Sequence, residues 1–478
     1  MQYSQYINGA FCAGSSAEQF EVISPASGKP IGSYAMADAN DVARAIECAK
    51  QAHAAWKKSG ATQRLELLRG IAMEMRADRD NFATQIASEL GKPYGEAQKE
   101  VDTAAEMFEW AAEEARRLYG RVIPARSPGI QQIAQLEPIG VVAGFSGWNA
   151  PAITPSRKIS AALAAGCSIV IKPSEETAGV ALLIAQACER AGAAAGLVNM
   201  VFGNPAAIAD QLCSAPDIAM ITFTGGTEVG KQLGAKAALH MKRATLELGG
   251  HAPVIVWKDV DIDKVAATTA ATKYRNAGQV CTSPTRFLVH ESIYDAFCEK
   301  FAEQAMKLRV RDPFDADAQM GPLKNRRRLL AIEQLVSNAR ENGARLLAGG
   351  KAISDRPGFF YEPTVLALRD KKADASRIEP FGPVALLIPV KDADEALREA
   401  NSLPFGLAAY AFTNDMRLAH RFANEIESGV VCINELQASL PETPFGGYKD
   451  SGLGSEGGIE GLREFLKVKC VRQGGLTA

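Results

Sequence analysis

The sequence has few of the patterns that hold metal ions or link thiols. Its five histidines are dispersed and form neither an HExxH motif nor a mixed Cys/His ligand pattern, so we expect no metal site. Nine cysteines, an odd number, are scattered between Cys12 and Cys470 without a CxxC pair. Such cysteines are typical of a reducing compartment, where thiols stay free.

Targeting and membrane signals are also lacking. The first residues, MQYSQYINGAFCAG, contain no basic segment followed by an apolar core, and no apolar run reaches membrane-spanning length. The net charge is only -2 with the two signs interspersed, which provides no basic surface for nucleic acid or for a membrane. The sequence therefore predicts a cytoplasmic enzyme that acts on a small molecule, with neither a nucleic acid nor a membrane as partner.

Two stretches of alternating strands and helices dominate the chain, which at 478 residues is long enough for two or three domains. Strands alternate with helices from residue 139 to residue 248, which predicts a parallel sheet covered on both faces. A second alternating set begins near residue 252, and a mostly helical stretch at 38–119 precedes both sets. The strand-like segment 120–137 contains two prolines and fits a helical layer poorly, so we place it in a hairpin that leaves the domain body.

Several polar side chains follow predicted strands at the edge where ligands of parallel sheets gather. The Asn149 amide is suited to hold an oxyanion, or alternatively to close a local turn. Lys172 and Glu175 directly follow a buried strand, where they would bind ribose hydroxyls or form a solvated strand end. Glu247 ends another apolar strand, where burial would raise its pKa toward that of a general base; a structural hydrogen bond is the alternative.

Two glycine-containing turns complete this set of candidates. Gly225 and Gly230 in FTGGTEVGK would expose backbone N–H groups to a pyrophosphate, or serve close packing. Cys281 lies in NAGQVCTSP between Gly278 and Pro284, which predicts a turn between a helix and a strand. A thiol in a turn is a candidate nucleophile, with an inert buried cysteine as the alternative.

The order of these motifs resembles that of the aldehyde dehydrogenase superfamily over essentially the whole chain, with the succinate semialdehyde dehydrogenase-like group the most similar. The matching motifs are WN at Trp148, KPSE ending at Glu175, FTG from Phe223, ELGG from Glu247, GQVC ending at Cys281, EPFGPV from Glu379, and the later PFGG and SGLGSE.

The resemblance implies an α/β fold with two Rossmann-type parallel-sheet domains and a small bridging β-hairpin. We accordingly expect an NAD(P)-binding domain at 1–119 and 139–247 and a catalytic domain at 248–445. Residues 120–138 and 458–478 would form an oligomerisation element that builds a homodimer or homotetramer.

The resemblance also implies roles for individual residues. Cys281 would attack an aldehyde, Asn149 would hold the oxyanion, and Glu247 would activate the water that hydrolyses the thioester. We expect NAD as cofactor, because the Glu175 carboxylate would repel the 2′-phosphate of NADP, although some family members with this glutamate accept both. The expected cofactor-binding residues are Trp148, Lys172, Glu175, Phe223, Gly225, Gly226, Gly230, Glu379 and Phe381.

Three positions depart from patterns found in the family. Gly226 replaces a serine whose hydroxyl touches the pyrophosphate in many members. Ala150 replaces the usual aromatic residue, which should widen the substrate tunnel. Ser283 stands where some succinate semialdehyde enzymes have a second cysteine, so we expect no disulfide to Cys281 by that route.

The substrate prediction depends on Arg157, Arg275 and Ser439. These residues match the positions with which succinate semialdehyde dehydrogenases hold the far carboxylate of their substrate, which predicts an ω-carboxylated aldehyde. One alternative is a bulkier keto-acid semialdehyde, for which Ala150 would leave room. Another is that the arginines are surface or structural residues and that the substrate is an aromatic or aliphatic aldehyde. A non-catalytic member of the fold and a coenzyme A-acylating enzyme are further alternatives, against which the presence of Cys281 and Glu247 argues.

Overall fold

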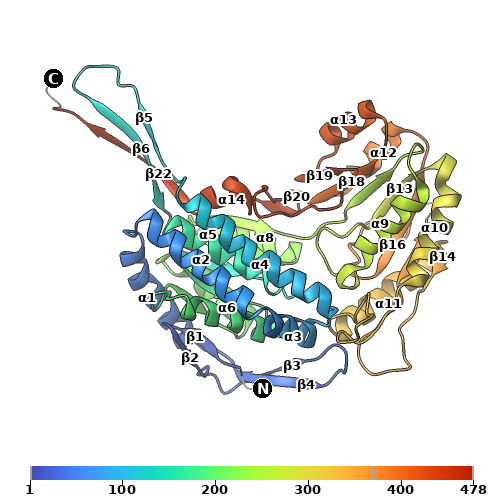
Figure 1. Ribbon diagram of the computed structural model, residues 1–478, viewed down its shortest axis with the longest axis horizontal. Helices are drawn as coiled ribbons and strands as arrows, with labels where there is room; N and C mark the ends of the chain where they lie inside the picture. Colours follow the sequence, from blue (N-terminus) through green and yellow to red (C-terminus); the bar gives the residue numbers. More distant parts are fainter. Residues whose placement is uncertain (1–2, 369–371, 476–478) are drawn as a thin grey trace.

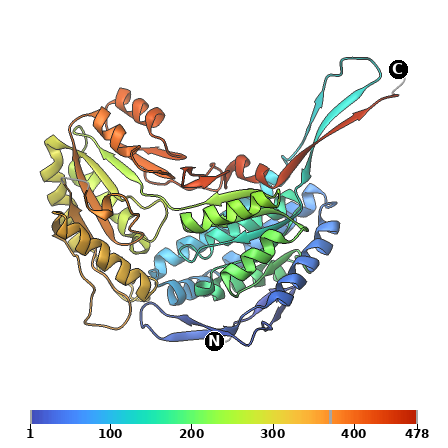
Figure 2. The ribbon, with the colours of Figure 1, turned by 180° about the vertical axis from the view of Figure 1, so that it is seen from behind.

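Two large sheets and one projecting sheet organise the chain, as the computed structural model shows for residues 3–368 and 372–475 (Figures 1 and 2). The predicted fold class is therefore confirmed. Residues 1–2 and 476–478, the outer ends of the predicted segments 1–119 and 458–478, lie outside the described residues.

The first lobe is built on an eight-stranded sheet of order β2-β1-β9-β8-β7-β10-β11-β21. Its strands are β1 (Gln5–Ile7), β2 (Ala10–Cys12), β7 (Val141–Phe145), β8 (Ser168–Lys172), β9 (Val198–Met200), β10 (Ile218–Thr224), β11 (Arg243–Glu247) and β21 (Gly452–Leu453). The five strands β7 to β11 run parallel, and β1 and β21 pair antiparallel with the outer members. The buried apolar runs of β7, β8 and β9 explain why helices cover both faces.

Helices pack on both faces of this first sheet. They are α1 (Ala39–Trp56), α2 (Ala61–Ala77), α3 (Arg79–Leu90), α4 (Tyr94–Ala115), α5 (Ile153–Ala165), α6 (Ala178–Arg190), α7 (Pro205–Ser214) and α8 (Thr227–Leu239), with a short 3-10 turn η1 (Glu175–Thr177). One apolar core includes Leu68, Phe108 and Ile184 from α2, α4 and α6. A separate core includes Ile46 and Leu212 from α1 and α7.

The second lobe is built on a seven-stranded sheet of order β14-β15-β16-β13-β12-β18-β19, parallel except for β14. Its strands are β12 (Pro253–Val256), β13 (Arg286–His290), β14 (Arg345–Ala348), β15 (Thr364–Ala367), β16 (Val384–Val390), β18 (Ala408–Phe412) and β19 (Val430–Ile433). The helical elements are α9 (Ile262–Tyr274), η2 (Arg275–Gly278), η3 (Glu291–Ile293), α10 (Tyr294–Lys307), α11 (Arg326–Glu341), η4 (Asp374–Ser376), α12 (Ala393–Ala400) and α13 (Met416–Glu425).

The predicted hairpin leaves the body of the molecule, as Figure 1 shows at the upper left. Strands β5 (Arg121–Ile123), β6 (Gln131–Pro138) and β22 (Leu466–Gln473) form a three-stranded sheet of order β22-β6-β5. The remaining elements are the pairs β3 (Gln19–Ile23) with β4 (Pro30–Ala35) and β17 (Phe405–Gly406) with β20 (Tyr448–Lys449), and the helix α14 (Gly458–Glu464). No helix in the described ranges is long and apolar enough to cross a bilayer.

The C-terminal part of the chain contributes to the first lobe. The segment predicted as an oligomerisation element from residue 458 begins with α14, whose Leu462 packs into the core of the first lobe. The strand β21 likewise pairs with β11 at the edge of the first sheet. These late residues thus help to close the first lobe before the chain reaches β22.

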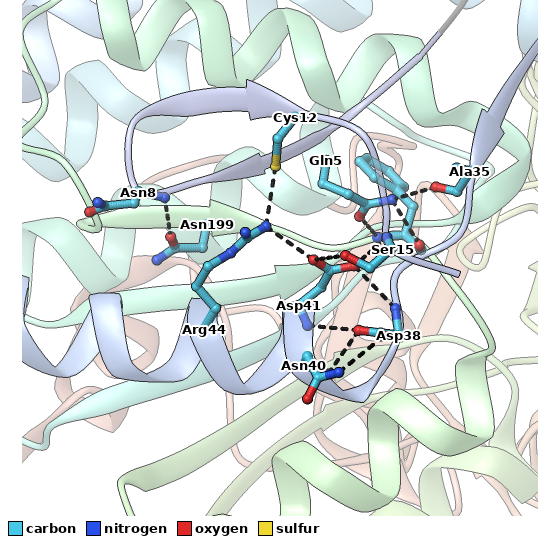
Figure 3. A network of polar contacts seen from close by, with 11 residues as sticks. Gln5, Asn8, Cys12, Ser15, Ala35, Asp38, Asn40, Asp41, Arg44 and Asn199 are labelled. Atoms are coloured by element: carbon cyan, nitrogen blue, oxygen red, sulfur yellow. Dashed lines mark hydrogen bonds and ion pairs between the residues drawn. The ribbon is translucent and has the colours of Figure 1, made fainter. Parts of the chain in front are cut away.

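A polar network joins the chain around β1 and β2 to the start of α1 (Figure 3). The Asp41 carboxylate accepts hydrogen bonds from Ser15 N at 2.7 Å and from Arg44 at 3.0 Å. Asp38 caps α1 by accepting from the backbone N–H of Asp41, whose own side chain accepts from Asp38 N. This reciprocal capping box satisfies the first turn of the helix and fixes the chain that enters it.

Candidate active site

Cys281 lies in a turn directly after η2, as predicted. Asn276, Ala277 and Gly278 have successive φ values of 50°, 53° and 71°. This left-handed conformation costs a non-glycine residue about 1–3 kcal/mol, so surrounding contacts must hold it. A Cβ at Gly278 would lie 2.1 Å from the carbonyl oxygen of Gly382, which explains the glycine.

Amide side chains hold the segment Asn276–Cys281, which we call the cysteine loop. Asn276 Nδ2 donates to Asn149 O at 3.0 Å and to Gln279 O at 3.2 Å. Gln279 Nε2 donates back to Asn276 O at 3.0 Å. Asn149 Nδ2 donates to Gln279 O at 3.2 Å, which places the Asn149 amide beside the cysteine loop. An amide nitrogen carries two N–H groups, so one donor of Asn149 is available to a ligand.

The Cys281 thiol is protonated near neutral pH in this environment. Burial, followed by the charges of Glu379 and Glu247, raises its pKa to about 12, although a hydrogen bond from the Thr282 backbone N–H acts in the opposite direction. Because the thiolate is the nucleophile, the reaction requires a base that removes this proton.

Glu247, the predicted base, ends β11. Burial and then the charge of Glu456 raise the pKa of Glu247 well above its ordinary value of 4.5. Within the described part of the chain, neither carboxyl oxygen of Glu247 has a hydrogen-bond partner, so a structural hydrogen bond does not account for it. A buried carboxyl without a partner is free to exchange a proton with a neighbouring group.

An ion pair beside Glu247 was missed by the sequence reasoning. The buried Lys158 ammonium forms a short ion pair with Glu456 and also donates to Thr224 Oγ1 at 2.8 Å. The available signal was a lysine on the buried helix α5, but its partner lies 298 positions away.

The glycines just before and within α8 have two different roles. Gly226 is the N-cap of α8 without a side-chain hydrogen bond, and no described atom lies within 4 Å of the position of a Cβ there. Free N–H groups and open space at a helix N-terminus fit a pyrophosphate. A Cβ at Gly225 would meet the Phe223 ring at 2.4 Å, and one at Gly230 would meet Leu248 at 2.1 Å, so these glycines permit close packing.

The other predicted cofactor residues form two groups. Lys172 at the end of β8 forms a short ion pair with Glu175 at the start of η1. Trp148 and Phe381 meet edge to face with ring centroids 5.5 Å apart. Burial raises the pKa of Glu379 to about 8, and the Gly250 N–H donates to it. These acceptors, flat apolar faces and open N–H groups together fit a dinucleotide.

The structure brings two of the three predicted substrate residues together. The Arg157 guanidinium donates to Ser439 Oγ at 2.6 Å and lies 4.9 Å from the centre of the Phe445 ring. Arg157 is buried, whereas Arg275, directly before the cysteine loop, is exposed. Arg275 has no hydrogen-bond or ion-pair partner among the described residues, although its charge opposes the burial that raises the pKa of Glu96.

A second buried lysine near the cysteine loop was also missed. Lys273 Nζ donates to Ser283 Oγ at 3.1 Å, two residues after Cys281. Burial lowers the pKa of Lys273 to about 7, although the charge of Glu379 acts in the opposite direction. The sequence signal was a lysine in the last turn of α9, which resembles an ordinary solvated residue.

Other cysteines and acidic groups do not form a comparable site. Cys167 and Cys188 lie in the core of the first lobe, and burial raises their pKa values to about 11 and about 12. Neither lies in a turn beside an unpartnered carboxyl. Over the described ranges, no group of three or more His, Cys, Asp and Glu side chains is arranged to hold a metal ion.

Comparison with known proteins shows the family. The model of the aldehyde dehydrogenase family matches residues 11–471. The chain is 39% identical over 463 residues to the NADP(+) succinate-semialdehyde dehydrogenase of Escherichia coli, covering 97% of this chain and 96% of the relative. It is 41% identical over 466 residues to a 4-(hydroxymethyl)benzenesulfonate dehydrogenase of Comamonas testosteroni, with the same coverage.

Solved structures agree with this result. The crystal structure of an NAD-dependent aldehyde dehydrogenase from Sinorhizobium meliloti superposes with a TM-score of 0.97 at 34% identity, covering 100% of this chain and 96% of that one. The protein therefore belongs to the aldehyde dehydrogenase family and is an NAD(P)-dependent aldehyde dehydrogenase.

Proposed function

We propose that the protein oxidises an ω-carboxylated semialdehyde, such as succinate semialdehyde, to the dicarboxylic acid. The observation that carries this proposal is the state of Arg157, which is 7% exposed and has no carboxylate within ion-pair distance among the described residues. Its Nε also has no hydrogen-bond partner there. An isolated buried charge is costly, so an anionic substrate is the natural partner of this guanidinium.

The names of two relatives support an anionic substrate. One is named for succinate semialdehyde and the other for a benzenesulfonate. Both names describe molecules with a permanent negative charge at a distance from the reacting carbon. Arg157 with Ser439 provides the cation and hydroxyl that would bind such a charge. Arg275, directly before the cysteine loop, would add a second cation.

In the first half of the reaction, Glu247 removes the proton from Cys281 Sγ. The sulfur then forms a bond to the aldehyde carbon, and the negative charge on the aldehyde oxygen is held by the Asn149 amide and the Cys281 backbone N–H. A nicotinamide cofactor held beside Trp148 and Phe381 would supply the acceptor for the hydride of this carbon. A thioester on Cys281 results.

In the second half, Glu247 directs water to the thioester. Glu247 first releases to solvent the proton it took from Cys281, and its carboxylate then takes a proton from water as the water oxygen bonds to the carbonyl carbon. The C–S bond then breaks, the carboxylic acid leaves, and Cys281 Sγ regains a proton. The presence of a base at Glu247 favours hydrolysis over transfer to coenzyme A.

We propose NAD as the preferred cofactor. Lys172 and Glu175 would bind the adenosine ribose, and Glu379 would bind the nicotinamide ribose beside Trp148 and Phe381. The Glu175 carboxylate would repel a 2′-phosphate. The relative named for NADP(+) makes NADP the alternative to test.

A bulkier anionic aldehyde is the second candidate. Ala150 directly follows Asn149 and has a small side chain in a half-buried position, which would leave room for a ring or a branched chain. The sulfonated aromatic named for one relative is of this kind.

The test compares succinate semialdehyde, a sulfonated benzaldehyde and an uncharged aldehyde of similar length. Wild-type protein should prefer an anionic aldehyde by kcat/KM, and Arg157→Ala/Arg275→Ala should lose that preference by about tenfold to a hundredfold. Turnover of the uncharged aldehyde should change little. Equal or better turnover of the uncharged aldehyde by wild-type protein would show that the arginines are structural.

We further propose a cytoplasmic homodimer or homotetramer. Val122 and Val468 on the projecting sheet are 71% and 70% exposed, which is suited to burial against a second copy. Light scattering of wild-type protein and Val468→Asp tests this: a monomeric wild-type protein would contradict it.

A further inference from the structure

We propose that Lys324 is a positioning residue that fastens the cysteine loop to the first lobe. Lys324 lies just before α11 and is buried, with 1% exposure. Its Nζ donates to Ile23 O at 3.1 Å and to Glu89 O at 2.7 Å. These oxygens end β3 and the last turn of α3, so the ammonium joins two segments of the first lobe. Figure 1 shows the start of α11 beside α3.

The ammonium of Lys324 also faces the predicted cofactor site. Glu176 Oε2 lies 3.8 Å from Nζ, and Glu176 directly follows the ribose residue Glu175. Asn325, the next residue in the chain, donates from Nδ2 to both Glu176 oxygens at 3.1 Å and 2.9 Å. Lys324 and Asn325 together thus hold η1 in place.

The backbone of Lys324 reaches the cysteine loop. Its N–H donates to Gln279 Oε1 at 2.9 Å, and Gln279 is fully buried. The other end of the Gln279 amide donates to Asn276 O. One residue therefore binds the first lobe through its ammonium and the cysteine loop through its backbone.

The cysteine loop needs such an external contact. Its left-handed residues Asn276 and Ala277 persist only when surrounding contacts fix them. The bonds between Asn276 and Gln279 are internal to the loop and would move with it. Asn149 and the Glu96 carboxylate, which accepts from Asn276 N at 3.0 Å, also hold the loop from the first lobe. The bond to Lys324 adds an anchor from Gln279 to α3, β3 and η1, and so helps to set the distance between Cys281 and groups of the first lobe such as Glu247.

The positive charge of Lys324 indicates a positioning role and not only space filling. Burial lowers the pKa of Lys324, although the charges of Glu176 and Glu89 act in the opposite direction. An apolar side chain would fill this space without the cost of burying an ammonium. The ammonium instead selects one position by binding oxygens from three segments.

This inference rests on Cys281 as the nucleophile of the proposed function. Lys324→Met removes the ammonium and keeps the length of the side chain. Lys242→Met is the matched control, because Lys242 Nζ also donates to two backbone carbonyls, Ala215 O at 2.5 Å and Ile218 O at 2.6 Å, away from the cysteine loop. Both variants should lower the melting temperature.

Two measurements distinguish positioning from stability, both made well below the melting temperature. They are kcat and the rate at which iodoacetamide alkylates Cys281, which peptide mass spectrometry follows. Lys324→Met should lower both by about tenfold or more, because Cys281 moves away from its base, and leave the KM for NAD within about threefold. Lys324→Arg should recover part of the loss, and Lys242→Met should stay within about twofold of wild type.

Wild-type values of kcat and alkylation in Lys324→Met would overturn the inference, as would an equal loss in Lys242→Met. If Lys324→Met does not fold, Gln279→Leu removes the link from the loop side and should slow alkylation likewise; a wild-type rate would overturn the inference. A separate experiment tests the proposed function itself: full activity in Cys281→Ser would show that Cys281 is not the nucleophile.

Discussion

Lys158 and Glu456 form a buried ion pair whose two charges act in opposite directions on the pKa of Glu247. Glu456 raises this pKa and Lys158 lowers it. The ion pair therefore adjusts how readily the proposed base gives up its proton. Removing one of the two charges should shift the pKa of Glu247 in a direction that can be measured.

Glu456→Gln removes the charge that raises the pKa of Glu247 and leaves the Lys158 charge that lowers it. The pKa of Glu247 should fall, so its basic form should be present at lower pH. The acid limb of the kcat/KM profile should shift toward lower pH relative to wild type. An unchanged limb, or a shift to higher pH, would contradict this assignment.

Cys281→Ser should lose dehydrogenase activity by at least about a thousandfold, because a hydroxyl is a much weaker nucleophile than a thiolate. Reduction of the cofactor is followed by absorbance. Cys167→Ala is the control, since Cys167 lies in the core of the first lobe, and its activity should remain close to that of wild type. Activity in the Cys281 variant would remove the nucleophile assignment.

Glu247→Gln should slow both halves of the reaction, because Glu247 is proposed to take the proton of Cys281 and later a proton of water. Steady turnover should fall by about 10²–10⁴-fold. The first turnover, followed by cofactor absorbance after rapid mixing with NAD and aldehyde, should be slowed as well. Normal steady turnover would show that another group activates water, and acceleration by coenzyme A would favour the acylating alternative.

Glu175→Gln should shift cofactor preference toward NADP. The variant removes the carboxylate that opposes a 2′-phosphate and frees the Lys172 ammonium from its ion pair. The ratio of kcat/KM for NADP to that for NAD should rise by about tenfold or more. A constant ratio would place the discrimination elsewhere in the site.

Lys273→Met should stabilise the protein more at low pH than at high pH. Burial lowers the pKa of Lys273 from 10.5 to about 7, so the folded state binds fewer protons than the unfolded state between these values. The penalty in wild type is complete below pH 7 and disappears as pH rises toward 10.5. The gain in melting temperature should therefore be larger near pH 6 than near pH 10, with the exposed Lys264→Met on α9 as control. An equal gain at both pH values would contradict this.

Local patterns in the sequence were sufficient for most of the fold. The turn that was predicted to hold Cys281 between a helix and a strand indeed lies between α9 at Ile262–Tyr274 and β13 at Arg286–His290. The Asp261 side chain caps α9, which is a signal carried by neighbouring residues. The short helices α12 and α13 were not singled out, because about two turns of helical pattern provide little signal.

The arrangement of the site depended on contacts that no local pattern encodes. The positive φ values of Asn276 and Ala277 are held by Asn149 and Gln279 after the chain has folded. The ion pair of Lys158 with Glu456 joins residues 298 positions apart. Sequence motifs indicated which side chains carry chemistry, but not which buried charges surround them.

The projecting sheet has a consequence for the synthesis of the chain. Strand β6 pairs along its whole length with β22, and the Lys469–Glu137 ion pair between them joins residues 332 positions apart. At about 5–20 residues per second, a ribosome needs roughly 17 to 66 seconds to make that interval. For this time β6 has an open edge that can pair with any other exposed strand. Nascent chains on neighbouring ribosomes should therefore aggregate or recruit chaperones through β6 more readily than the finished protein does.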